Sequence, residues 1–223
     1  MQGRPRQPWQ LEQLLSPARI GPYLIAVPTN DWSDAVALYD WNTRASAAFF
    51  EDLHYLEVGL RNAMDLTLVD YAAKLNTDDP WFATPKIALS PGSRGVIAKA
   101  RDRATQGGAI PELHGKVIAE LTFGFWWSLL SDGYNRSLWA PCLKDAFDGQ
   151  VRRQRLHSVL NDMRVLRNRI AHHEPLHARD LATDHQVLLD VAGRVAAPLR
   201  SHIESLTRVP EVLSGRPSQS APR

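Results

Sequence analysis

Helical periodicity limits the possible folds of this chain more than any other feature. From Asn30 or Ser33, either of which can cap a helix, a 3.6-residue apolar pattern continues to Leu75 almost without a breaker. We predict two helices there, over about 33–43 and 45–75. No stretch of useful length alternates between apolar and polar residues with period two, so the whole chain is predicted to be all-α.

Proline and glycine divide the rest of the chain. Residues 1–30 are rich in proline and predict an irregular N-terminal arm with one short helix near 11–15. Further helices are expected over about 90–106, 112–131, 137–147, 150–172 and 183–206, the last one bent at Pro198. We therefore expect a bundle of about six to eight helices over 31–207, followed by a flexible, disordered tail at 208–223.

Composition indicates a globular protein, with 44% hydrophobic and 22% charged residues. The lone Cys142 excludes an internal disulfide and fits a reducing compartment. No stretch approaches the roughly 18 apolar residues of a membrane span, and no signal-peptide run follows the basic N-terminus. We expect a cytoplasmic protein that does not engage a membrane.

Arginine is concentrated in one segment. The net charge of +2 is too small to predict a partner, but six arginines lie between Arg152 and Arg169 and only one acid, Asp162, lies among them. Such a strip can attract a polyanion or can form a solvated, arginine-rich face. Both interpretations remain open.

The segment 156–175 carries the most informative residues. Leu156, Leu160, Met163 and Ile170 fall on one apolar stripe of a helix, and Arg167 lies in the middle of that stripe. A guanidinium cannot lose its proton and is costly to bury without a partner. Arg167 therefore needs either a buried acidic partner or a cleft that water and a ligand can reach.

His172 follows Arg167 by five positions, which on a continuous helix places it about 140° away around the axis. Because the residue before Pro175 is biased away from the α region, we predict that the helix unwinds near 171–174. His172 and His173 could then turn back toward Arg167. An arginine and a histidine at a helix end make a phosphate site, since the guanidinium fork binds phosphate and imidazole titrates near neutrality.

A second helix offers a partner for Arg167. Glu57 lies on the core stripe of the predicted helix over 45–75, and His54, Arg61 and Asp65 lie along its edge. Glu57 can pair with Arg61 one turn away or can face Arg167 across a helix pair. The aromatic run FGFWWSLL at 123–130 predicts packing in the core or at a dimer interface.

The run VLRNRIAHHEPL resembles the signature of the Abi-like (abortive-infection) proteins, a branch of the all-α HEPN superfamily. The segments LYDWN (38–42), LHYLEVGLRNAMD (53–65) and ELTFGFWWSLL (120–130) also resemble parts of that family, so the similarity covers roughly residues 35–190. The catalytic HEPN pattern is an arginine, an adjacent polar residue and a histidine after a short spacing. Arg167, Asn168 and His172 match it, and His173 satisfies the spacing too.

This resemblance implies a metal-independent endoribonuclease without a cofactor, active as a homodimer in phage defence or as a toxin. The expected partners are RNA, a second copy of the chain and an antitoxin. His172 would act as general base or acid, Arg167 would hold the scissile phosphate and Asn168 would position the ring or the substrate, leaving 2′,3′-cyclic phosphate ends. The expected supporting residues are His173, Glu57, Arg61 and His54, and the expected RNA-guiding residues are Arg152, Arg153, Arg155, Arg164 and Arg169.

Two other interpretations remain. In a non-catalytic RNA-binding or protein-interaction module, Arg167 would only tie helices together through Glu57, and the histidines would cap a helix end. A metal site formed by His172, His173, Glu174 and His177 is the second, although the helical H-E-x-x-H zinc pattern is missing. Accessibility of Arg167 discriminates catalysis from a structural role.

Overall fold

The computed structural model describes residues 10–217, so the expectations for residues 1–9 and 218–223 lie outside the described residues. The described part contains α-helices and short helical turns without a strand, which confirms the all-α fold. The α-helices are α1 (Leu11–Leu15), α2 (Pro17–Ala26), α3 (Trp32–Lys74), α4 (Pro91–Ala104), α5 (His114–Ala119), α6 (Phe123–Ser128), α7 (Arg153–Ala171), α8 (Leu181–Val195), α9 (Ala197–Leu206) and α10 (Val209–Ser214).

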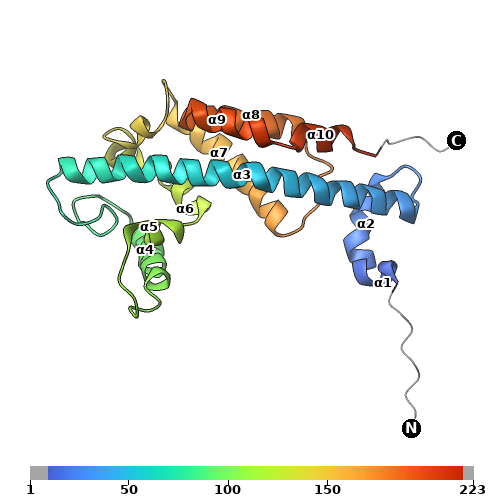
Figure 1. Cartoon of the computed structure of the whole chain (residues 1–223), viewed down its shortest axis with the longest axis horizontal. Coiled ribbons are helices and arrows are strands. Elements are labelled where there is room, and N and C mark those ends of the chain that lie inside the picture. Colours follow the sequence, from blue (N-terminus) through green and yellow to red (C-terminus); the bar gives the residue numbers. More distant parts are fainter. Residues whose placement is uncertain (1–9, 218–223) are drawn as a thin grey trace, which may run out of the picture.

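Helix α3 is the axis of the molecule. It is one helix of 43 residues instead of the two that we predicted, because nothing in its sequence breaks it. Asp31 caps its start by accepting the backbone N–H groups of Ser33 and Asp34. Figure 1 shows α2 packed near its first turns, α6 and α7 against its middle, and α8, α9 and α10 along one side.

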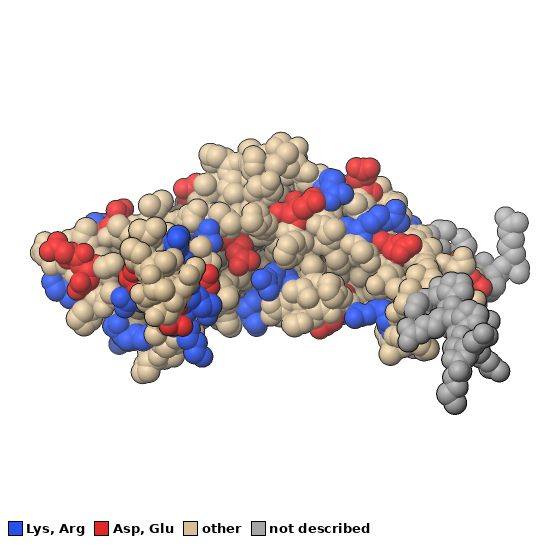
Figure 2. Space-filling model, turned by 60° about the horizontal axis from the view of Figure 1, so that its bottom comes forward, with Lys and Arg blue, Asp and Glu red and all other residues tan. Residues whose placement is uncertain are grey.

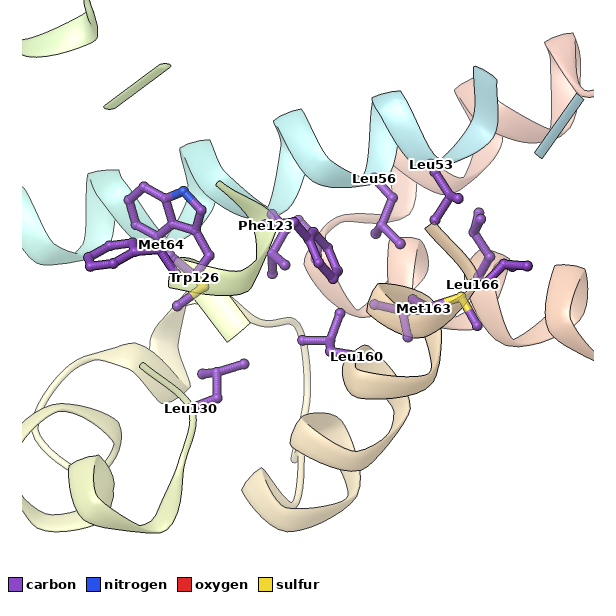
Figure 3. Close-up of a cluster of buried hydrophobic side chains, with 14 of the residues drawn as sticks. Leu53, Leu56, Met64, Phe123, Trp126, Leu130, Leu160, Met163 and Leu166 are labelled. Atoms are coloured by element: carbon purple, nitrogen blue, oxygen red, sulfur yellow. The ribbon is translucent and has the colours of Figure 1, made fainter. Parts of the chain in front are cut away.

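One part of the hydrophobic core lies where α3, α6 and α7 meet. Leu56 and Met64 of α3 face Phe123 and Trp126 of α6, and Leu160 of α7 closes the cluster (Figure 3). All five side chains are at most 5% exposed. Phe123, Phe125 and Trp126 are therefore core, as predicted, whereas Trp127 is only partly buried.

Tertiary contacts divide the stretch over 112–131 that we predicted to be one helix. Helix α5 ends at Ala119 and α6 begins at Phe123, whose backbone N–H donates to Glu57 Oε1 at 3.2 Å. The helix expected over 137–147 is also absent, because short 3₁₀ and π turns occupy Asp132–Trp139 and Leu143–Ala146.

The predicted irregular arm is largely helical within its described residues. Helices α1 and α2 cover Leu11–Leu15 and Pro17–Ala26, and α2 inserts Ile20 and Tyr23 fully into the core. Burial of these two side chains explains why a proline-rich segment is ordered on the bundle.

The C-terminal prediction also needs correction. The expected bent helix is a helical hairpin, because the chain reverses at Ala196, and Arg200 of α9 pairs with Asp190 of α8 at 2.9 Å. Pro198 lies in the first turn of α9, where its missing N–H costs little. The flexible tail predicted from 208 onward is wrong for Val209–Ser214, since this segment forms α10 with Val209 buried.

Within residues 10–217, none of the helices, including α3, combines the length and the apolar character that crossing a bilayer requires.

Candidate functional site

Helix α7 carries the arginine and histidine motif. Its core face consists of five buried side chains, which fix the rotation of the helix: Leu156, Leu160, Met163, Leu166 and Ile170. Arg167, which we predicted in the middle of this face, is only partly buried and lies beside Glu57 of α3.

Arg167 is accessible and has an acidic neighbour. Its side chain is 37% exposed, and its Nε lies 3.9 Å from Glu57 Oε2. That Nε is buried and makes no hydrogen bond to the described residues. The predicted Glu57–Arg167 pair is therefore present as a loose ion pair, whereas Arg61 Nε donates to Asn62 Oδ1 at 3.3 Å instead of to Glu57. The guanidinium retains donors for a ligand.

The helix ends within the predicted range of 171–174, but no hydrogen bond or ion pair joins His172 to Arg167 among the described residues. Helix α7 remains regular through Ala171, and His172 is its C-cap, donating its backbone N–H to the Asn168 carbonyl at 2.9 Å. Five helical positions separate the two side chains by about 140° around the axis and about 7.5 Å along it. The described contacts include no hydrogen bond or ion pair between them, so one chain alone does not join the pair.

His173 occupies a strained backbone position. Its φ is +56°, and its N–H and that of Glu174 bond back to the carbonyls of Ile170 and Arg169. This is the Schellman closure of a helix, whose left-handed residue is usually glycine. Both His172 and His173 are exposed, so both imidazoles can reach solvent.

Three arginines hold the loop that follows the motif. Arg19 Nη1 donates to the His173 carbonyl, and Arg169 Nη2 donates to the Pro175 carbonyl at 2.7 Å. Arg216 Nη2 donates to the His177 carbonyl at 2.9 Å. Arg169, which we expected to guide RNA, is thus occupied with its own loop and also lies 3.3 Å from Glu174 Oε2. Arg19 and Arg216 were missed because no local pattern predicts contacts this distant in sequence.

Tyr23 and His177 pack together beneath this loop. Their ring centroids are 5.2 Å apart, and neither Tyr23 Oη nor His177 Nε2 has a hydrogen-bond partner among the described residues. Burial raises the pKa of Tyr23 to about 12. Burial, together with the positive charges of Arg216 and Arg169, lowers the pKa of His177. His177 is therefore a neutral, packed ring at neutral pH.

The predicted RNA-guiding strip is not one surface. Arg153 is only 8% exposed, and its guanidinium donates to the Leu130 carbonyl, Asn135 Oδ1 and Asp132 Oδ1. It is a structural residue, and its assignment to RNA is wrong. Arg152 and Arg155 are exposed but lie at the opposite end of α7 from Arg167.

Arg164 lies one helical turn before Arg167 on α7. Its guanidinium carbon lies 4.7 Å from the Trp127 ring, which stacks on His157, and it donates to Asn161 Oδ1 at 2.8 Å. Positive and negative side chains are mixed on the face that Figure 2 shows, without a continuous basic band.

The remaining candidates lie outside this cluster. His54 is exposed and its ring packs edge-on against Tyr55. Asp65 accepts hydrogen bonds from Trp81 Nε1 at 2.6 Å and from the His114 ring at 2.9 Å. Over residues 10–217, no three His, Cys, Asp or Glu side chains gather in a way that could hold a metal ion, so His172, His173, Glu174 and His177 do not converge.

No protein-family model matches the chain, and no curated protein or solved structure matches it at a significant level.

Proposed function

We propose that this chain is an Abi-like HEPN endoribonuclease that cuts RNA without a metal and acts in phage defence or as a toxin. The observation that carries the proposal is the Arg167 guanidinium, whose side chain is 37% exposed and whose two Nη groups make no hydrogen bond among the described residues. An arginine with free donors next to a single carboxylate can exchange that loose contact for the oxygens of a phosphate.

RNA cleavage suits this set of groups because RNA carries its own nucleophile. The 2′-oxygen attacks phosphorus, the bond to the 5′-oxygen breaks, and a 2′,3′-cyclic phosphate forms. One group takes the 2′-hydroxyl proton and another protonates the 5′-oxygen, while Arg167 stabilises the charge on the phosphorane. Asn168, on the same end of α7, positions the imidazole or the substrate.

Two copies of the chain supply what one copy lacks. A homodimer that brings both His172 side chains to one phosphate provides an acid and a base at once. The exposure of His172 at the end of α7 leaves its imidazole available to a partner copy. An antitoxin that binds the same end of α7 would block both dimer formation and RNA cleavage.

The test incubates purified protein with total RNA in the presence of a chelator and maps fragment ends. We expect 2′,3′-cyclic phosphate ends, and His172→Ala and Arg167→Ala should each abolish cleavage without changing the circular dichroism spectrum. The exposed residues His202 and Arg136 provide matched alanine controls that should cleave normally. Unchanged cleavage by both site variants would reject these roles.

A non-catalytic RNA-binding module is the second candidate. It is favoured by the separation of Arg167 and His172 within one chain and by the carboxylate of Glu57 beside Arg167. In that case RNA binding depends on Arg167, no cleavage occurs, and His172→Ala leaves the affinity unchanged.

A further inference from the structure

An open groove lies at the opposite end of α7 from Arg167. It has a volume of about 830 Å³ and lies between the start of α7, the end of α8 and the first turn of α9. This volume is comparable to that of a drug-sized ligand site, so the groove has room for several side chains of a partner. From Arg155 to Arg167 the helix rises about 18 Å, which separates the groove from the proposed cleavage site.

Two helices form the long walls of this groove. The lining residues extend over 152–159 at the start of α7 and over 187–194 of α8, and these two helices pack against each other. Each wall therefore rises by about 10 Å, which is about two helical turns. A groove between two helices is a common docking place for a third helix, whose side chains enter it at intervals of three and four residues.

The floor of the groove is aliphatic. It consists of Leu156 and Val159 of α7 with Val187 and Val191 of α8. Val159 and Val187 are only half-buried, so a partner can cover them and displace water from them. None of the described lining residues is aromatic, so the floor offers no ring on which a nucleic-acid base could stack. Leucine, isoleucine or valine side chains of a peptide match this floor.

The rim of the groove carries unpaired positive charge. Arg152, Arg155 and Arg194 line the groove and are exposed, and their guanidinium groups make no hydrogen bond or ion pair with the described residues. Arg200 differs, because it donates to Asp190 at 2.9 Å. Three like charges held close together repel one another, so a partner with several carboxylates is attracted to this rim.

One unpaired carboxylate also lies on the rim. Asp148 is exposed, and its backbone N–H donates to the Arg194 carbonyl at 2.6 Å, which places it at the end of α8. A single carboxylate offsets only part of the charge of three free arginines. The groove therefore remains positive and disfavours a basic segment.

We propose that this groove binds a partner protein through an acidic amphipathic helix of about two turns. The aliphatic side chains of that helix cover the leucine and valine floor, and its aspartate or glutamate side chains pair with the three free arginines of the rim. A simple anion would leave the floor uncovered, and a purely apolar segment would leave the arginines unpaired. The proposal is independent of the cleavage chemistry, because it uses neither Arg167 nor His172.

The experiment selects ligands for the full chain from a displayed library of helix-forming peptides of about 15 residues, a length at which an isolated helix can form. We expect enrichment of sequences that combine aliphatic residues at i and i+3 or i+4 with flanking aspartate or glutamate. The most enriched peptide is then synthesised, and its binding is measured by fluorescence anisotropy. We expect a Kd below about 100 μM.

Two variants separate charge from shape. Arg155→Glu combined with Arg194→Glu should weaken binding of the acidic peptide at least about tenfold. A matched peptide with lysine in place of its acidic residues should bind this variant and not the native chain, which requires the variant to be folded. Ala197→Trp, on the exposed rim, should block the groove without changing its charge. Arg136→Glu, at an exposed position outside the groove, is the control and should bind the acidic peptide normally.

Three results would overturn the proposal. They are a selection that does not enrich acidic aliphatic sequences, peptide binding that is unchanged in both variants, and displacement of the peptide by a single-stranded RNA oligonucleotide that itself requires Arg155 and Arg194. The last result would assign the groove to an RNA strand instead of a protein helix.

Discussion

Arg19 donates a hydrogen bond to the carbonyl of His173, a residue 154 positions later in the chain. This contact ties α2 directly to the loop that carries the motif histidines. Together with Arg169 and Arg216, it engages three alternate carbonyls of one loop from three parts of the chain. The segment predicted to be an irregular arm therefore helps to position the candidate site.

Arg19→Ala should loosen this loop while leaving the bundle intact. The amide of Leu176, which donates to Asn42 Oδ1 at 2.6 Å, reports on the loop. Because a hydrogen bond from a charged donor contributes roughly 1.5 kcal/mol, hydrogen exchange at this amide should become about tenfold faster.

Arg44→Ala is the control for Arg19, since Arg44 is exposed and its one hydrogen bond to the described residues stays within α3, to the Asp40 carbonyl at 3.4 Å. Equal exchange rates at Leu176 in the Arg19 variant and the native chain would show that the contact does not hold the loop.

Arg153 should contribute to the stability of the fold and not to RNA binding. In Arg153→Met the alkyl packing is kept, but the Leu130 carbonyl and the Asn135 amide lose their donor. We expect the free energy of unfolding to fall by roughly 2–3 kcal/mol. Arg152→Met, at the exposed neighbouring position, should change it by less than about 0.5 kcal/mol. Urea denaturation measures both, and equal effects would contradict the structural role of Arg153.

Local sequence patterns correctly predicted helix starts and buried helix faces, because interactions between residues close in sequence determine them. The serine and proline at 90–91 predict a helix start, and Ser90 does cap α4 by accepting the Ser93 N–H at 3.1 Å. The apolar stripe of α7 is buried as predicted, and the Glu57–Arg167 pair forms because both side chains lie at the edge of facing helices.

The prediction failed where distant parts of the chain decide. The break between α5 and α6 depends on the acceptance of Phe123 N–H by Glu57, 66 positions earlier. The end of α7 near 171–174 was predicted correctly from Pro175, but the contacts of the following loop with Arg19 and Arg216 come from distant parts of the chain. Arg153 resembled a surface arginine, and only the turn at Leu130–Asn135 gives it acceptors.

His173→Gly should stabilise the protein. His173 holds a left-handed φ of +56°, which costs a residue with a Cβ more than it costs glycine. After the greater unfolded-state entropy of glycine is counted, we expect a gain of roughly 0.5–1 kcal/mol. Ala171→Gly, in the last turn of α7, should instead destabilise by a similar amount. Thermal denaturation measures both variants. A loss of stability in His173→Gly would show that the imidazole stabilises the fold by more than the backbone strain costs.

Acid should destabilise the fold through His177. Its folded pKa is lowered from the ordinary value of 6.5, chiefly by burial. The unfolded chain therefore binds a proton that the folded chain resists, so stability is full above the unfolded pKa and declines as pH falls below it. His177→Phe keeps a ring against Tyr23 and removes this titration.

The slope of unfolding free energy between pH 5 and pH 7 should accordingly be smaller in His177→Phe, by at most about 1.4 kcal/mol per pH unit. Above pH 7.5 the two curves should run parallel, which serves as the internal control. Identical slopes in the acid range would mean that His177 titrates in the folded state as it does in the unfolded one.

Mixed dimers test whether two copies share one cleavage centre. The helical geometry separates Arg167 from His172 within a chain, so the proposed mechanism needs both His172 side chains on one phosphate. When native and His172→Ala chains are mixed equally and allowed to exchange, only native homodimers retain both imidazoles. Cleavage per chain should then fall to about one quarter of the native value, because random pairing leaves that fraction of native dimers. Native mass spectrometry verifies the exchange. A fall to one half would mean that each chain contributes an independent site, and the shared acid and base would have to be abandoned.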